Sequence, residues 1–242
     1  MSRTILASRY MLVLAMTLAG AAGSSAAEPT TLNQPTADET AAGFRPLFNG
    51  KDFSAWKPNG KPGSFSVKDG MIVGDRPKGS DLAYWLSTER EYGDFELRLQ
   101  YRISRNGNSG IFLRAPHEGR TSKMGMEIQI LDDAGKPGAP GVGDTGAIYR
   151  VVAPKRRASK PAGEWNDLWI LCDGDRVRVT LNGEVVTDAS MADHADLKTR
   201  PRTGYIGLSA HTDPVHFRNI RLREIRRTPP QASAPTTSPT TP

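Results

Sequence analysis

The feature that most restricts how this chain can fold is an unbroken alternation of apolar and polar residues over 94–103. Every second residue is large and apolar, and the residues between them are charged or, at Gln100, an amide. A period of two matches a β-strand with one buried face, whereas an amphipathic helix needs a period of about 3.6. The chain is therefore predicted to form a long, half-buried strand here, with its buried face made by Phe95, Leu97, Leu99, Tyr101 and Ile103.

Strand signals recur along the chain, and no long segment has a helical period. They lie at 110–114, 126–131, 176–181, 204–210 and 215–225. Asn182-Gly183 predicts a two-residue hairpin turn into 184–186, and 189–197 is expected to form a short helix. The 24 Gly and 18 Pro among 242 residues fit a loop-rich β protein. Short strands without βαβ alternation predict an antiparallel sandwich or barrel and give no Rossmann-type site, so no nucleotide cofactor is expected.

The two ends of the chain have a different character from its middle. Residues 1–27 match a secretory signal, because a basic start precedes a 12-residue apolar run and a small-residue cleavage point at Ser25-Ala26-Ala27. We expect 28–42 to be a spacer and 228–242, rich in Thr and Pro, to be a disordered tail. The folded domain should therefore span 43–227, exported to the periplasm or beyond, with no stable membrane insertion once the signal is removed.

Cysteine usage and charge narrow the class of protein further. Cys172 is the single cysteine, which excludes an intramolecular disulfide and a lipid anchor at the cleavage point, and it is expected to pack as a small hydrophobe. The net charge of +6 makes polyanion binding worth testing, and Lys155-Arg156-Arg157 is the densest basic stretch. Export and the lack of aromatic residues in that stretch favour a solvated loop, so no nucleic-acid partner is expected.

Several motifs occur in an order that matches one family of exported bacterial domains. Together they resemble the 3-keto-disaccharide hydrolase domain family, also described as 3-keto-glucoside lyases and 3-keto-glucal hydratases. The resemblance covers about 44–225 and implies a concanavalin A-like jelly-roll sandwich of two antiparallel sheets. The matching motifs are Leu47-Phe48-Asn49-Gly50-Lys51-Asp52, Gly93-Asp94-Phe95-Glu96-Leu97, Asn108-Ser109-Gly110-Ile111-Phe112-Leu113-Arg114, Glu127-Ile128-Gln129-Ile130-Leu131-Asp132, Thr145-Gly146-Ala147-Ile148-Tyr149, Pro161-Ala162-Gly163-Glu164-Trp165-Asn166 and Phe217-Arg218-Asn219-Ile220.

One stretch departs from the family pattern. Members typically have Gln-Asp-His-Gly where this chain has Ser209-Ala210-His211-Thr212. The histidine is kept, but the Gln, the acid and the Gly are replaced. This departure leaves open a non-catalytic, lectin-like glycan-binding module on the same sandwich.

The resemblance implies a substrate whose sugar carries a ketone at carbon-3, which makes the hydrogen on carbon-2 acidic. A base can remove that hydrogen, the enolate can expel the group on carbon-1, and water can then add. Such a substrate implies a functional link to a sugar 3-dehydrogenase. The reaction needs a base, an electrophile at the ketone oxygen and a proton donor to the leaving oxygen.

Glu127 and His211 are the candidates for the general base or for metal ligands. Glu127 and Gln129 lie on the polar face of an alternating strand, which either lines a cleft or is a solvated sheet face. His211 follows a buried-looking strand and is either a base or ligand, or a histidine bonded to a loop carbonyl. Glu127 and His211 together are candidate ligands for a divalent cation, and Gln129 is a candidate substrate-binding residue.

Four further residues are assigned candidate roles, each with a structural alternative. Arg114 is expected to bind the enolate oxygen or else form a salt bridge. Tyr149 is expected to protonate the leaving oxygen or stack on sugar, or else to be a core-edge residue. Asp132 and Trp165 are candidate substrate-binding residues, with a turn role and a packing role as alternatives. No Gly-x-Ser-x-Gly or His-Glu-x-x-His motif occurs, so serine hydrolases and zincins receive little weight.

Overall fold

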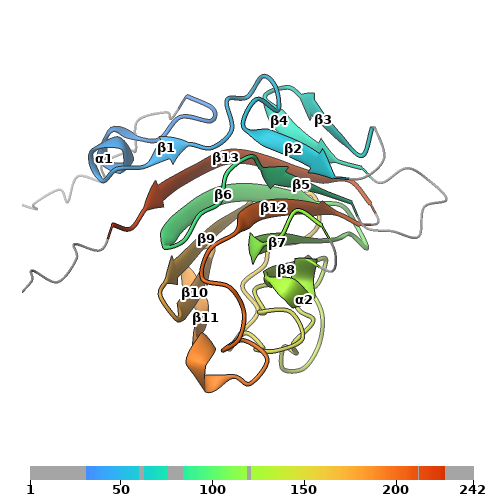
Figure 1. Ribbon diagram of the computed structural model, residues 1–242. Coiled ribbons are helices and arrows are strands. Elements are labelled where there is room, and N and C mark those ends of the chain that lie inside the picture. Colours follow the sequence, from blue (N-terminus) through green and yellow to red (C-terminus); the bar gives the residue numbers. More distant parts are fainter. Residues whose placement is uncertain (1–30, 60–62, 76–83, 119–120, 212, 227–242) are drawn as a thin grey trace, which may run out of the picture.

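The computed structural model describes residues 31–59, 63–75, 84–118, 121–211 and 213–226, and they form two antiparallel sheets that share one core (Figure 1). The larger sheet has the order β11-β10-β9-β6-β13-β4-β3, with β1 also paired to β13. Its strands are β1 (Arg45–Pro46), β3 (Phe65–Lys68), β4 (Met71–Gly74), β6 (Phe95–Ile103), β9 (Asn166–Asp173), β10 (Arg176–Leu181), β11 (Glu184–Ser190) and β13 (Val215–Glu224). The predicted all-β sandwich of antiparallel strands is confirmed.

The smaller sheet has the order β2-β5-β12-β7-β8. Its strands are β2 (Trp56–Asn59), β5 (Tyr84–Thr88), β7 (Asn108–Ala115), β8 (Met126–Leu131) and β12 (Tyr205–Ala210). The short helix α2 (Thr121–Met124) lies beside β8 (Figure 1), in the connection from β7. None of the helices in the described ranges is long and apolar enough to cross a membrane.

The alternation predicted over 94–103 is strand β6, in which buried and half-buried residues alternate without a break. Phe95, Leu97 and Leu99 are at most 1% exposed, and they meet the inward residues of the smaller sheet, such as Ile128 of β8, in the shared core. Cys172 is likewise buried, and burial raises the pKa of its thiol to about 12, so it behaves as the expected small hydrophobe.

The predicted hairpin turn at Asn182-Gly183 joins β10 to β11. Both residues have positive φ, 51° and 86°, the conformation that a two-residue hairpin turn with right-handed strand twist requires. The helix expected over 189–197 is wrong for most of its length. Ala189 and Ser190 continue β11 and pair with β10, and only the single 3-10 turn η1 (Met191–Asp193) follows.

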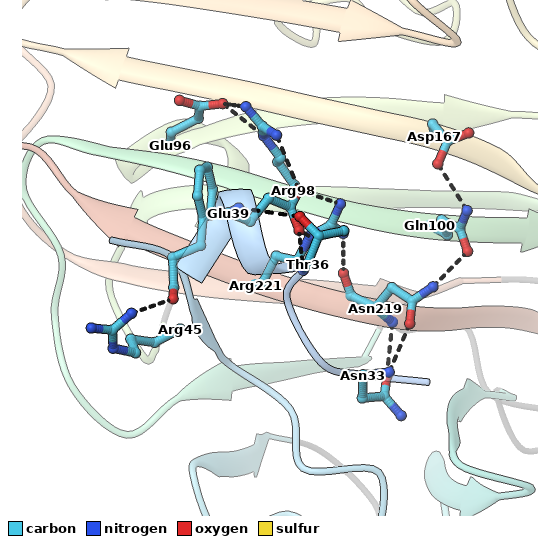
Figure 2. Close-up of polar contacts among 11 residues, drawn as sticks. Asn33, Thr36, Glu39, Arg45, Glu96, Arg98, Gln100, Asp167, Asn219 and Arg221 are labelled. Atoms are coloured by element: carbon cyan, nitrogen blue, oxygen red, sulfur yellow. Dashed lines mark hydrogen bonds and ion pairs between the residues drawn. The ribbon is translucent and has the colours of Figure 1, made fainter. Parts of the chain in front are cut away.

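The residues expected to be a spacer instead contribute to the fold over 31–42. Helix α1 (Ala37–Ala41) begins with a capping box, in which Thr36 and Glu39 bond each other's backbone N–H groups. Glu39 then accepts hydrogen bonds from Arg98 of β6 and Arg221 of β13, as Figure 2 shows. Asn33 exchanges hydrogen bonds with Asn219, so the segment is tied to the outer face of the larger sheet at two points.

The remaining expected boundaries lie outside the described residues, namely the signal peptide at 1–27 and the tail at 228–242. The basic stretch at 155–157 is described, and two of its three side chains have carboxylate partners. Arg156 pairs with Glu184, and Arg157 pairs with Asp144 at 2.8 Å. These ion pairs hold the loop against the sandwich and reduce the charge that it presents to a polyanion.

Candidate active site

A cleft of about 790 Å³ lies on the outer face of the smaller sheet. Its floor is made by outward-facing residues of four strands, because alternate residues of β5, β7, β8 and β12 point away from the core. Its walls come from α2, from the loop around 149–151 and from residues 195–200. The polar floor residues are Asn108, Glu127, Gln129 and Ser209, and the apolar ones are Trp85 and Phe112.

Glu127 lies on the floor of this cleft as its strand pattern predicts. Its neighbours Met126 and Ile128 are fully buried in the core, so the Glu127 side chain projects from the opposite face of β8. The carboxyl group lies over Gly110 of β7: a Cβ placed on Gly110 would overlap Oε1 and lie only 2.9 Å from Cγ. The absence of a side chain at position 110 therefore creates the space that the carboxyl group occupies.

The surroundings of Glu127 make it a weaker acid than an exposed glutamate. Burial raises its pKa to about 7, and the positive charge of Arg150 opposes part of this rise. Among the described residues no cation forms an ion pair with its carboxylate. A carboxyl group that titrates near neutral pH in a cleft is a candidate general base.

Gln129 stands two residues further along β8 and is 4% exposed. Its amide nitrogen donates to Oδ1 of Asn108 at 2.8 Å, which fixes the orientation of the amide group. Within the described ranges no residue donates to its amide oxygen. Gln129 therefore presents an oriented acceptor to a sugar hydroxyl on the cleft floor.

Tyr149 and Arg150 enter the cleft from a loop that runs along β8. The Tyr149 N–H donates to the Glu127 carbonyl at 2.8 Å, so the loop is attached to the strand that carries the candidate base. Arg150 has a left-handed backbone, with φ of 65°, and its N–H donates to the Val142 carbonyl at 2.8 Å. Its guanidinium carbon lies 5.2 Å from the centre of the Tyr149 ring. Sequence reasoning missed Arg150, although it directly follows the motif that ends at Tyr149.

His211 follows β12 and lines the same cleft, so the structure brings together Glu127, Gln129, Tyr149 and His211. Within the described ranges no group of three or more His, Cys, Asp or Glu residues is arranged to hold a metal ion. Glu127 and His211 therefore offer at most two protein ligands from this set, fewer than the three that catalytic zinc sites usually use.

The prediction for Arg114 is wrong, because its side chain is fully buried away from the cleft. Its guanidinium donates to the carbonyls of Gly93 and Gly174 and to the Asp94 carboxylate, each at 2.9 Å. Strict alternation would place Arg114 on the same face as Phe112, but its φ of 49° interrupts the strand geometry. Its role is the structural alternative, a buried ion pair.

Asp132 and Trp165 also lie away from this cleft. Asp132 accepts a hydrogen bond from the Asn106 N–H at 2.9 Å and lines a separate groove between loops, consistent with its turn role. Trp165 precedes β9 and packs under Arg218 on the outer face of the larger sheet. Neither residue contributes to the cleft that holds Glu127.

The altered stretch 209–212 affects the cleft at a defined point. Ser209 points into the cleft, whereas Ala210 is buried in the core, and Thr212 lies outside the described residues. Of the altered positions, Ser209 is therefore on the cleft floor and Ala210 is a core residue with no contact to the cleft.

Comparisons with known proteins agree with this architecture. The family model of the 3-keto-alpha-glucoside-1,2-lyase-like domain matches residues 43–223. A 3-keto-disaccharide hydrolase from Bacteroides thetaiotaomicron is 28% identical, and the match covers 83% of each chain. The solved structure of a candidate glycosyl hydrolase from Parabacteroides distasonis, also 28% identical, has a TM-score of 0.69 and covers 81% of this chain and 100% of its own.

A more distant similarity concerns the fold alone. The carbohydrate-binding module CBM66 from Bacillus subtilis is 16% identical, with a TM-score of 0.51 over 72% of this chain and 98% of that module. Together with the two antiparallel sheets, this likeness confirms the predicted concanavalin A-like jelly-roll class.

Proposed function

Because the chain belongs to the 3-keto-alpha-glucoside-1,2-lyase-like domain family, we propose that it is a carbohydrate hydrolase that cleaves 3-keto-glycosides by elimination followed by hydration. The observation that carries this proposal is the Glu127 carboxyl group, which is held over Gly110 on the floor of a cleft and has a pKa of about 7. The name of the Bacteroides relative supports the substrate class.

Glu127 is the base in this scheme. It removes the proton from carbon-2, the electron pair forms the enolate of the ketone, and the enolate then expels the glycosidic oxygen from carbon-1. Water adds to the resulting enone, so that the sum of the two steps is hydrolysis. A base with a pKa near the working pH is deprotonated often enough to act and basic enough to accept the proton.

Arg150 takes the role that the sequence assigned to Arg114. Its guanidinium lines the cleft, stands near the Tyr149 ring and interacts electrostatically with Glu127. In the proposed scheme it donates hydrogen bonds to the enolate oxygen, where negative charge develops. Tyr149 or His211 protonates the leaving oxygen, and Gln129 binds a sugar hydroxyl.

The substrate must be supplied by an oxidation of the sugar's 3-hydroxyl, the reaction of a sugar 3-dehydrogenase. We place this reaction and the hydrolysis outside the cytoplasm, on the basis of the signal-like residues 1–27. The proposal needs no nucleotide cofactor and no nucleic-acid partner.

The test is to incubate the purified protein with 3-keto-trehalose and to measure the glucose released, beside unoxidised trehalose. Wild type should release glucose from the ketone only, and Glu127→Gln should reduce the rate by about 10²-fold or more, the contribution of a general base. Release of no product with or without added divalent cation would refute the enzymatic proposal. Activity that persists in the presence of a chelator would exclude only the need for a divalent cation and would leave the enzymatic proposal intact.

A glycan-binding module is the second candidate, favoured by Ser209 at the cleft floor in place of the family's Gln. Tight binding of unoxidised polysaccharide by a protein that does not turn over any 3-keto-glycoside would support it.

A further inference from the structure

The outer face of the larger sheet is rich in arginine. Seven arginines project from it on three strands, at positions 98, 102, 176, 178, 218, 221 and 223. Five of them form ion pairs with carboxylates, at Arg98, Arg176, Arg178, Arg221 and Arg223. Figure 2 shows part of this pattern, in which Glu39 forms ion pairs with Arg98 and Arg221. Each of these five arginines therefore has a carboxylate partner, and they share three carboxylates, Glu39, Glu96 and Asp188.

Arg102 and Arg218 are the exceptions. Neither has a carboxylate within ion-pair distance in the described part of the chain. Arg218 donates from Nε to the Gln100 side-chain oxygen at 2.8 Å. The neighbouring acid, Asp167, is engaged by the nitrogen of the same amide, also at 2.8 Å (Figure 2).

Both guanidinium groups pack on one indole. The guanidinium carbon of Arg218 lies 3.9 Å from the centre of the Trp165 ring, and that of Arg102 lies 4.9 Å from it. The two arginines come from the adjacent strands β13 and β6, where Arg218 stands opposite Gln100 and Arg102 opposite His216. The indole therefore contacts both planar cations and orients them.

This arrangement leaves repulsion that an anion would relieve. Burial lowers the pKa of Arg218, and the charge of Arg102 lowers it further, while the charge of Asp167 opposes part of this fall. Stacking on the indole limits the rotamers of both side chains, so less conformational entropy is lost when their N–H groups bind an oxyanion. A guanidinium presents a planar pair of donors that matches a carboxylate, and the half-buried Trp165 ring holds two such groups close together.

We propose that Trp165, Arg102 and Arg218 form a second binding site, which holds the uronate residues of an acidic polysaccharide. The site is on the outer face of the larger sheet, whereas the cleft of Glu127 is on the outer face of the smaller sheet, so a polymer bound here leaves the cleft accessible. This proposal does not depend on the reaction in the cleft, because it rests on different residues.

The experiment is calorimetric titration of the full chain with tetragalacturonate, with neutral maltotetraose as a length-matched control. Wild type should bind tetragalacturonate and not maltotetraose at this site, and Arg102→Gln and Arg218→Gln should each weaken binding by about tenfold. Arg176→Gln is the matched control, because Arg176 lies on the same sheet but is paired with Asp188. Arg102→Lys, which keeps the charge but loses the planar fork, should lose affinity too.

Several results would overturn the site. One is the absence of tetragalacturonate binding by the wild type. Another is equal loss of binding in Arg176→Gln, which would indicate a diffuse charge effect. Equal affinity for a DNA duplex or for anionic vesicles would show a general polyanion surface rather than a uronate site. Loss of binding in Glu127→Gln, with Arg102→Gln unaffected, would place the ligand in the cleft. Failure of 3-keto-trehalose cleavage would leave this binding result unchanged.

Discussion

Replacing Gly110 with alanine should impair catalysis by displacing the Glu127 carboxyl group. The added methyl group would overlap Oε1 and lie 2.9 Å from Cγ and 3.0 Å from Cδ of Glu127. Carbon atoms pack at about 3.5–4.0 Å, so the Glu127 side chain must move by roughly 1 Å. Gly110 does not have a left-handed φ, and alanine is therefore compatible with its backbone. The strain is expected to fall on Glu127.

Two effects of this displacement can be estimated. A reacting group misplaced by about 1 Å costs about 10²-fold in rate, which should appear in kcat with KM little changed. Movement toward water should also lower the pKa of Glu127 from about 7 toward its ordinary value of 4.5. At pH 5.5 about 3% of a base with pKa 7 is ionised, against about 90% of one with pKa 4.5. The deficit of the variant should therefore be roughly 30-fold smaller at pH 5.5 than at pH 8.

The assay is the pH dependence of kcat on 3-keto-trehalose for wild type, Gly110→Ala and a control, Gly143→Ala. A Cβ at position 143 meets no atom within 4 Å, so the control should keep the wild-type profile. A double-mutant cycle on thermal stability tests the geometry without activity: Gly110→Ala should cost less stability in a Glu127→Ala background, because the overlap is gone. Wild-type kcat and an unmoved acid limb in Gly110→Ala, together with additive stability effects, would refute the reasoning.

Three further predictions follow from the same contacts. Arg150→Gln should lower kcat by about 10²-fold, because the enolate oxygen loses its donor. It should also shift the acid limb of the pH–kcat profile to higher pH, because the cation that opposes the raised pKa of Glu127 is lost. A shift of that limb without a loss of kcat above pH 8 would show that Arg150 acts only through its charge on Glu127. Glu39→Gln should cost about 1–2 kcal/mol and lower Tm by about 3–8 °C in thermal unfolding, because the half-buried Arg221 loses its counter-ion and Arg98 keeps only Glu96. Glu184→Gln, in an exposed pair, should cost less than about 0.5 kcal/mol. Equal losses in the two variants would contradict the assigned burial. Glu127→Gln should be more stable than wild type at pH 8 and about equal at pH 4, and a deficit at pH 8 would contradict the desolvation of Glu127.

Strand periodicity predicted the fold well because a sheet with one face in a core imposes a period of two on any sequence. It also placed Glu127 and Gln129 on one face, and the family resemblance added Tyr149 and His211. The prediction for Arg114 was wrong because a single left-handed residue interrupts the alternation, and a positive φ at arginine has no sequence signature. The predictions for Trp165 and Asp132 were wrong because periodicity does not show which sheet, or which end of it, a loop residue will contact.

The N-terminal helix was missed for a different reason. Its composition suggested a spacer, yet Thr36-Ala37-Asp38-Glu39 contains the Thr-x-x-Glu spacing of a capping box. The spacing alone does not show that Glu39 will find Arg98 and Arg221, because these partners come from two strands more than 100 residues apart. Local signals predict that a helix can begin here, and only the assembled sheet supplies the cations that hold it.

Glu39 and Glu127 are both largely buried carboxylates, but their surroundings shift their pKa values in opposite directions. Burial alone would raise the pKa of Glu39, but the hydrogen bonds and charge of Arg221 lower it below its ordinary value. Glu127 has no such partner among the described residues, and its pKa rises from 4.5 to about 7. A raised carboxyl pKa stabilises the fold most below pH 4.5, and that stability is lost as the pH rises through 7.

The folding stability lost when Glu127 ionises is large for a single side chain. A pKa of about 7 in place of 4.5 corresponds to roughly 3 kcal/mol of lost stability above pH 7, relative to a residue that does not titrate. Gln would fill the same space over Gly110 without this cost. A carboxyl group held where it weakens the fold, in a cleft with Tyr149, Arg150 and His211, is what the proposed function requires of a base, since packing alone would favour Gln.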